Sequence, residues 1–150
     1  MAISVLTSVG SIGNTVIDAI ADRLPKVKVG PGMDPESEMG PLITREHRDK
    51  VASYLDSGPA QGARIVTDGR DHPLYKESPG FFLAPSLMDD VTPDMDAYKD
   101  EIFGPVLSMT RVETYDQAVD LENRNPYGNG VVLFTRDGGA ARQFTFEVEA

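Results

Sequence analysis

The run Glu-Ile-Phe-Gly-Pro at residues 101–105 places a carboxylate and an aromatic ring two residues apart, just before a restricted bend. A carboxylate offers acceptor oxygens, a phenyl ring offers a flat apolar surface, and the Gly-Pro pair restricts the backbone that follows. Glu101 and Phe103 can therefore present both groups to one ligand. Spacing alone also fits a plainer interpretation, an exposed acid beside a core phenylalanine, and favours it.

Other residue types that commonly do chemistry are absent or isolated. The chain contains no cysteine, so these 150 residues hold no disulfide, thiolate metal site or cysteine nucleophile. The only two histidines are His47, in a charged helical pattern, and His72, in a polar loop, and we expect both to be solvated. There is also no Gly-x-Ser-x-Gly elbow. We therefore assign no catalytic residue.

Acidic residues gather before the 101–105 run, and they raise the question of a hard-cation site. A calcium loop that starts at Asp94 needs glycine at its sixth position, but residue 99 is lysine. We therefore predict no metal site but a solvated acidic surface, formed by Asp89, Asp90, Asp94, Asp96, Asp100 and Glu101.

Glycine-rich stretches give no phosphate-binding motif. Gly10 and Gly13 lack the third glycine of a dinucleotide fingerprint. Gly30-Pro31-Gly32 lacks a following Gly-Lys, and Pro31 has no N–H to donate, so we predict a rigid turn there. The pyrophosphate-binding half of a nicotinamide site is therefore not expected in these residues.

Composition narrows the class of partner. Fourteen basic and 24 acidic side chains leave a net charge of −10, which opposes binding to nucleic acid or to anionic membranes. No apolar run approaches the roughly 20 residues of a membrane-spanning helix, and the N-terminus lacks the basic region of a secretory signal. We expect a cytoplasmic protein with a single domain over residues 1–150.

Periodicity and capping residues predict alternating strands and helices. Thr44 is a plausible N-cap with Gly58 at the helix end, and Thr114 with Gln117 fits a capping box. These patterns predict an α/β fold with a largely parallel sheet and flanking helices. We expect a strand buried on both faces at 2–9, further strands at 63–67, 106–112 and 130–135, and an extended segment at 81–84. We expect helices at 12–24, 44–58, 114–123, 139–149 and shortly after 92–93, with turns over 30–41 and 68–80.

The 101–105 motif, with Met-Gly-Pro-Leu-Ile at 39–43 and Asn-Gly-Val-Val-Leu-Phe-Thr-Arg-Asp at 129–137, closely resembles the aldehyde dehydrogenase superfamily. The resemblance runs the whole length. Within the superfamily, the methylmalonate-semialdehyde dehydrogenases are most similar, on segments 1–4, 29–32, 38–45, 92–95 and 134–138. An aldehyde dehydrogenase catalytic-domain fold is therefore expected.

The resemblance implies roles for two residues. It implies that Glu101 corresponds to the family residue that binds the hydroxyls of the nicotinamide ribose, and that Phe103 packs beside the nicotinamide ring. It also implies an enzyme that oxidises a semialdehyde with NAD through a cysteine thioester, and then transfers the acyl group to coenzyme A with loss of CO₂. Asn129 and Gly130 are assigned to the fold, because a tight turn into a buried strand explains these residue types.

On the same alignment the chain starts one residue after the family's catalytic cysteine. The nucleophile, the general-base glutamate, the nucleotide-binding domain and the oligomerisation hairpin then lie outside it. We therefore expect a fragment that is inactive alone and binds no cofactor tightly. The resemblance implies that the parent enzyme is a homo-oligomer that acts on a small-molecule aldehyde. We also expect the fragment to self-associate through exposed sheet edges. The alternative is a non-catalytic binding or structural domain on the same scaffold.

Overall fold

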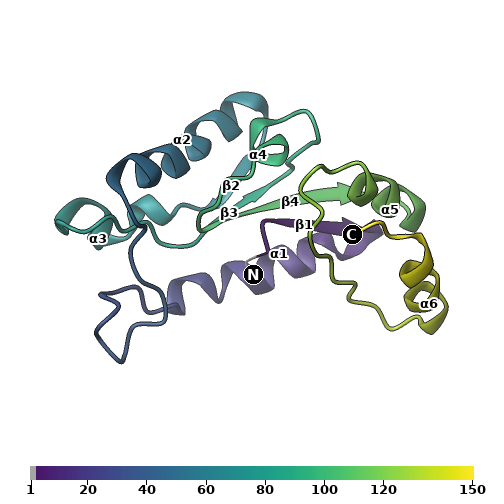
Figure 1. The fold of residues 1–150 in the computed structure, drawn as a ribbon, viewed down its shortest axis with the longest axis horizontal. Coiled ribbons are helices and arrows are strands. Elements are labelled where there is room, and N and C mark those ends of the chain that lie inside the picture. Colours follow the sequence, from purple (N-terminus) through teal and green to yellow (C-terminus); the bar gives the residue numbers. More distant parts are fainter. Residues whose placement is uncertain (1–2) are drawn as a thin grey trace.

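The computed structural model describes residues 3–150, which form one four-stranded sheet with helices on both faces (Figure 1). The first residues of the strand expected at 2–9, and the start of the similar segment 1–4, lie outside this range. The strands are β1 (Val5–Val9), β2 (Arg64–Thr67), β3 (Ser86–Asp89) and β4 (Val106–Val112). The helices are α1 (Gly13–Ala21), α2 (Arg45–Gln61), α3 (Pro73–Glu77), α4 (Asp96–Lys99), α5 (Tyr115–Asn123) and α6 (Gly138–Glu147), with 3-10 turns at Gly10–Ile12, Leu24–Lys26 and Gly69–Asp71.

The sheet is largely parallel, as predicted. The strand order is β1-β4-β3-β2, in which β4 pairs in parallel with β1 and with β3, while β2 pairs antiparallel with β3. We expected β1 to be buried on both faces, but most of its side chains are only half-buried. The reason is its place at the edge of the sheet, where β4 is its neighbour.

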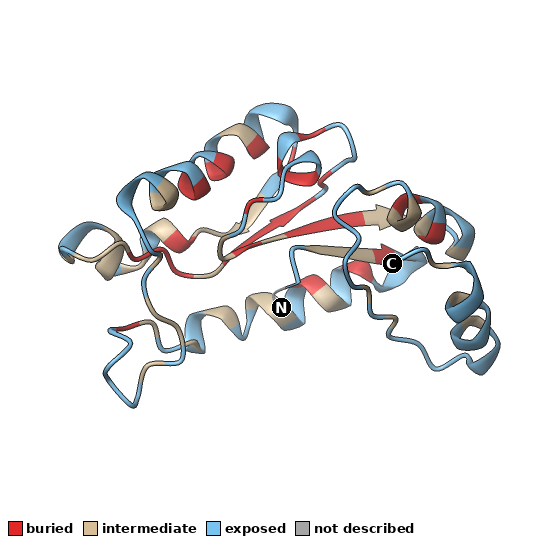
Figure 2. Cartoon of the chain, viewed as in Figure 1, coloured by how far each residue is buried: buried red, intermediate tan, exposed pale blue. Residues whose placement is uncertain are grey.

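Alternation along the strands sends side chains into two apolar layers. Leu107 and Met109 of β4 pack on the α1 side with Ile17, whereas Val106 packs on the other side with residues of α2 and α4. Figure 2 shows buried residues along the sheet and on the inward side of α2, while α6 and the segment before it are almost wholly exposed. The core is therefore centred on β3 and β4.

Local signals correctly located several helix ends. The Thr44 hydroxyl accepts a hydrogen bond from the His47 N–H, and Thr114 and Gln117 form the predicted capping box. The expected end of α2 at Gly58 is wrong, because the helix continues to Gln61 and Gly62 takes the left-handed position with φ 112°. Gly58 instead allows close packing, since a Cβ there would lie 2.7 Å from the Met88 sulfur.

Residues 81–84 lie just before the strand β3, which begins at Ser86. Their backbone is held by single hydrogen bonds, from the Leu42 N–H to the Phe81 carbonyl and from the Ala84 N–H to the Gly69 carbonyl. One turn prediction and one strand prediction are wrong. The polar stretch 68–80 contains a 3-10 turn and the helix α3. Residues 130–135 do not form a strand in the described structure, because no described strand pairs with them.

None of the helices within residues 3–150 combines the length and the apolar composition needed to cross a bilayer. The same residues contain no group of three or more histidine, cysteine or acidic side chains placed to hold a metal ion.

Candidate functional site

The turn at residues 100–105 points neighbouring side chains in opposite directions. Ile102 is 3% exposed and belongs to the larger apolar cluster, whereas the Phe103 ring is 78% exposed. The Phe103 backbone has φ 54°, a left-handed conformation that is uncommon for a residue with a Cβ. This conformation lets the chain leave the core at Ile102, expose Phe103, and return to the core at Val106.

One face of α2 supports this turn at three points. The Tyr54 hydroxyl donates a 2.7 Å hydrogen bond to the Asp100 carboxylate, and the His47 imidazole Nε2 lies 2.8 Å from the Phe103 carbonyl oxygen. Between these contacts Val51 packs so closely that a Cβ on Gly104 would lie 2.6 Å from its methyl carbons. His47, Val51 and Tyr54 share a helix face because residues four and seven positions apart are aligned on a helix.

Tyr54 is 6% exposed and belongs to the larger apolar cluster. Burial, together with the hydrogen bond to Asp100 and the negative charges of Asp100 and Asp96, raises the pKa of the Tyr54 hydroxyl to about 12. The phenol therefore stays protonated and donating at neutral pH.

Glu101 is exposed, unlike its neighbour Ile102, and lines an open pocket of about 460 Å³. The other residues around this pocket come from the C-terminal part of the chain: Asn125, Pro126, Tyr127, Gly128, Asn129 and Glu149. Phe103 is not among them, so the carboxylate and the ring have different surroundings. Sequence reasoning missed the pocket, because no local pattern relates Glu101 to a loop more than 20 residues away.

The two histidines are not part of a catalytic triad, but neither is simply solvated as expected. His47 is half-buried and hydrogen-bonded to the Phe103 carbonyl. His72 caps α3, where its Nδ1 accepts a 3.3 Å hydrogen bond from the Leu74 N–H. Both contacts depend on tertiary or capping geometry that charge pattern alone does not reveal.

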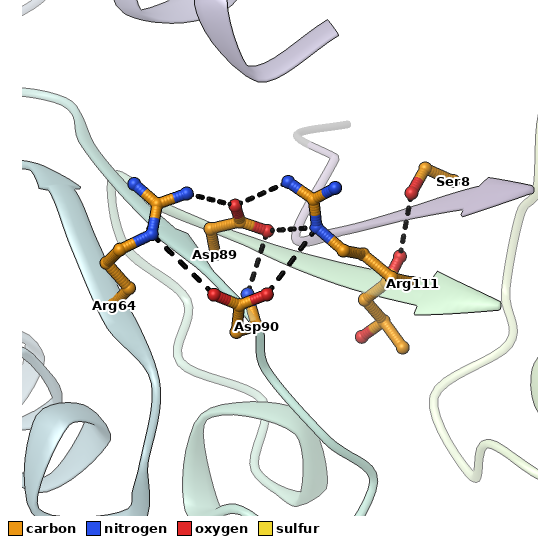
Figure 3. Close-up of polar contacts among 6 residues, drawn as sticks. Ser8, Arg64, Asp89, Asp90 and Arg111 are labelled. Atoms are coloured by element: carbon orange, nitrogen blue, oxygen red, sulfur yellow. Dashed lines mark hydrogen bonds and ion pairs between the residues drawn. The ribbon is translucent and has the colours of Figure 1, made fainter. Parts of the chain in front are cut away.

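A second polar cluster lies at the ends of β3 and β4 and includes Arg64 at the start of β2 (Figure 3). The Asp89 side chain is fully buried and accepts two hydrogen bonds from Arg111, at 2.9 and 2.7 Å, and one from Arg64 at 2.5 Å. The predicted solvated acidic surface is therefore wrong for Asp89, although Asp90, Asp94, Asp96 and Asp100 are exposed as expected.

Charge pairing decides the ionisation of Asp89. Burial by itself raises the pKa of this carboxyl, but the hydrogen bonds from Arg111 and the Asp90 N–H, and the charges of Arg111 and Arg64, together hold it below its usual value. All polar atoms of the Asp89 carboxylate are engaged by neighbouring groups. The cluster is thus a link between strands rather than an open binding site.

The chain belongs to the aldehyde dehydrogenase family, whose family model matches residues 1–150. It is 47% identical to malonate-semialdehyde dehydrogenase from Pseudomonas aeruginosa over 99% of this chain and 30% of that protein. It is also 37% identical to a mitochondrial, acylating methylmalonate-semialdehyde dehydrogenase of Arabidopsis thaliana, over 100% of this chain and 24% of that protein. The predicted family and its semialdehyde dehydrogenase branch are confirmed.

Solved structures agree with the fold. A putative methylmalonate-semialdehyde dehydrogenase from Sinorhizobium meliloti 1021, complexed with NAD, superposes with a TM-score of 0.93 at 46% identity, over 98% of this chain and 30% of that one. Betaine aldehyde dehydrogenase from Staphylococcus aureus, in complex with NAD⁺, superposes with a TM-score of 0.90 at 33% identity, over 97% of this chain and 29% of that one. The chain spans about a quarter to a third of the length of the curated relatives it matches.

Proposed function

We propose that this chain forms one wall of the cofactor site of an NAD-dependent, CoA-acylating dehydrogenase of malonate or methylmalonate semialdehyde. The family match and the names of the most similar relatives support the reaction class and the substrate. The observation that carries the site is the 100–105 turn, which exposes Glu101 and Phe103 and buries Ile102 between them.

The exposed groups fit a nicotinamide nucleoside. The Glu101 carboxylate faces an open pocket, where it can accept hydrogen bonds from the two hydroxyls of a ribose. The exposed face of Phe103 offers a flat apolar surface to a planar ring. NAD, when bound, supplies the acceptor for the hydride that leaves the substrate. The residues of this chain bind and orient; Gly104 and Val51 keep the turn close to α2.

Substrate chemistry is assigned to none of these residues. Oxidation through a thioester needs a thiolate, and the 150 residues contain no cysteine. We therefore expect the chain alone to be inactive towards aldehydes, and coenzyme A to be a co-substrate of the complete enzyme.

The reading frame that contains this chain provides the decisive test. We expect the whole frame to encode, outside these 150 residues, the cysteine that a thioester mechanism requires. The product of the whole frame should then reduce NAD with malonate or methylmalonate semialdehyde in a CoA-dependent manner. A start signal after unrelated DNA, or a whole-frame product without NAD reduction, would contradict the proposal and favour a non-catalytic domain.

The isolated chain should bind NADH weakly or not at all, because it contributes ribose-side and ring contacts and no pyrophosphate-binding loop. Isothermal titration calorimetry of the 150-residue chain with NADH measures this directly. Tight, stoichiometric binding would show that these residues form a complete cofactor site, against our proposal.

A further inference from the structure

His47 is the third residue of α2, and its imidazole reaches across to the turn that carries Glu101 and Phe103. Its backbone N–H is bonded to the Thr44 hydroxyl at 3.1 Å, so the N-cap fixes where the side chain starts. Its ring Nε2 lies 2.8 Å from the Phe103 carbonyl oxygen. A carbonyl oxygen accepts and cannot donate, so Nε2 must carry a proton in this contact.

Phe103 has a backbone conformation that needs support. A left-handed φ of 54° is unfavourable for a phenylalanine and persists only where its surroundings hold it. The other two supports from α2 act on neighbouring residues, since Tyr54 bonds Asp100 and Val51 packs on Gly104. The imidazole of His47 is the side chain of α2 that hydrogen-bonds Phe103 itself.

We propose that His47 is a positioning residue for the cofactor-site turn, which it holds by donating from Nε2 to the Phe103 carbonyl. This bond keeps the left-handed conformation of Phe103 and thereby keeps its ring projecting from the protein surface. The role as a cofactor-site residue rests on the proposed function, but the hydrogen bond and its effect on the turn do not. The neutral Nε2–H tautomer and the imidazolium both donate to the carbonyl, whereas the Nδ1–H tautomer cannot.

The first test is a spectroscopic measurement of the tautomer on the 150-residue chain. Selective ¹⁵N labelling of histidine gives signals from two residues only, and the His72→Ala variant assigns them. We expect the His47 Nε2 to carry the proton, and in a sample that also has ¹³C in the phenylalanine carbonyl groups we expect a coupling across the hydrogen bond to the Phe103 carbonyl carbon. A neutral His47 protonated on Nδ1 would overturn the proposal.

The second test measures the rigidity of the turn in matched variants. In the wild type and in His72→Ala, the Phe103 amide should have an order parameter of about 0.85, as in rigid backbone. His47→Ala should lower it to below about 0.6, the range of flexible backbone. His47→Gln should restore it, because the glutamine Nε2 can donate from a similar distance along the side chain.

A Phe103 amide that stays equally rigid in His47→Ala would overturn the proposal. Should His47→Ala fail to fold, the tautomer of the wild type and the rigidity of His47→Gln still decide the question, because a flexible turn in a folded glutamine variant also contradicts it. Neither test uses a nucleotide. If the whole-frame product does not reduce NAD, the proposed function is contradicted, but the results of these two tests do not change.

Discussion

At the scale of single residues, Gly104 shows how closely the 100–105 turn is fitted to α2. A Cβ at this position would lie 2.6 Å from both methyl carbons of Val51, a residue that is fully buried and cannot move aside freely. Replacement by alanine therefore forces either the turn or the helix to shift.

We expect Gly104→Ala to lower the free energy of unfolding by about 1 to 3 kcal/mol, the usual cost of overpacking. Gly32→Ala is the matched control, because nothing lies within 4 Å of a Cβ built there. Urea denaturation followed by circular dichroism measures both variants. Equal stability of the two variants would show that the turn can move away from Val51 without cost.

Tyr54 gives a pH dependence whose sign follows from its raised pKa. The hydroxyl has a pKa of about 12 in the folded chain, against 10.0 as the ordinary value, because burial and the bond to Asp100 favour the neutral form. Its contribution to stability is therefore complete below about pH 10 and is lost as the pH rises towards about 12.

Comparison of the wild type with Tyr54→Phe isolates this contribution. Between pH 10 and 12, the free energy of unfolding should fall more steeply in the wild type than in the variant. At neutral pH the variant should be less stable by about 1 kcal/mol, the typical value of one hydrogen bond. Parallel pH profiles would mean that Tyr54 ionises equally in the folded and unfolded chain.

At the scale of elements, Asp89 joins three strands through two arginines. Arg111 comes from β4, Arg64 from β2, and the fully buried Asp89 carboxylate at the end of β3 lies between them. Removal of the carboxylate leaves the two cations without their shared partner. Both arginines are partly exposed, so water can replace some of the lost interaction.

We expect Asp89→Asn to lower the free energy of unfolding by about 2 to 3 kcal/mol, which is less than the loss when a wholly buried ion pair is broken. Because pairing lowers the pKa of Asp89, its stabilisation is present above about pH 4 and is lost as the pH falls through its folded pKa. Asp90→Asn, at a half-exposed neighbour, is the control and should change stability by less than about 1 kcal/mol. Acid denaturation of the wild type, Asp89→Asn and Asp90→Asn measures how much stability each variant loses and whether that stability is lost as the pH falls.

At the scale of the whole molecule, the C-terminal part carries apolar side chains that nothing in residues 3–150 covers. Val132, Phe134 and Phe146 are 66, 80 and 83% exposed, and the helix α6 has no buried residue. The sheet also ends at β1 and β2, each with one strand neighbour. Exposed edges and apolar surface both favour association, while the net charge of −10 opposes it.

We therefore expect the chain to self-associate as its concentration rises, and more strongly in high salt, where the repulsion is screened. Sedimentation equilibrium measures the average mass under both conditions. Phe134→Asp should weaken the association more than Thr135→Asp, which adds the same charge at an exposed neighbour. A clean monomer over a wide concentration range would contradict this expectation.

Local patterns were sufficient for elements whose boundaries are set by neighbouring residues. Thr44 and Thr114 begin helices because each hydroxyl accepts a hydrogen bond from an N–H three residues later. The sequence pattern gave a wrong prediction where the structure of a segment depends on a neighbouring strand. Residues 130–135 have the composition of a strand, but a strand needs a neighbour for its backbone hydrogen bonds, and the described sheet provides none there.

The sequence by itself determined the family, the largely parallel α/β architecture, and Glu101 and Phe103 as the residues to examine, because these depend on short motifs and on the alternation of apolar residues. Only the tertiary structure decided what surrounds those residues. The hydrogen bond from His47 to the Phe103 carbonyl and the pocket shared by Glu101 and Asn125 both join residues that are 24 or more positions apart. The left-handed φ of 54° at Phe103 depends on such contacts. Packing sets these distances, and no local pattern encodes them.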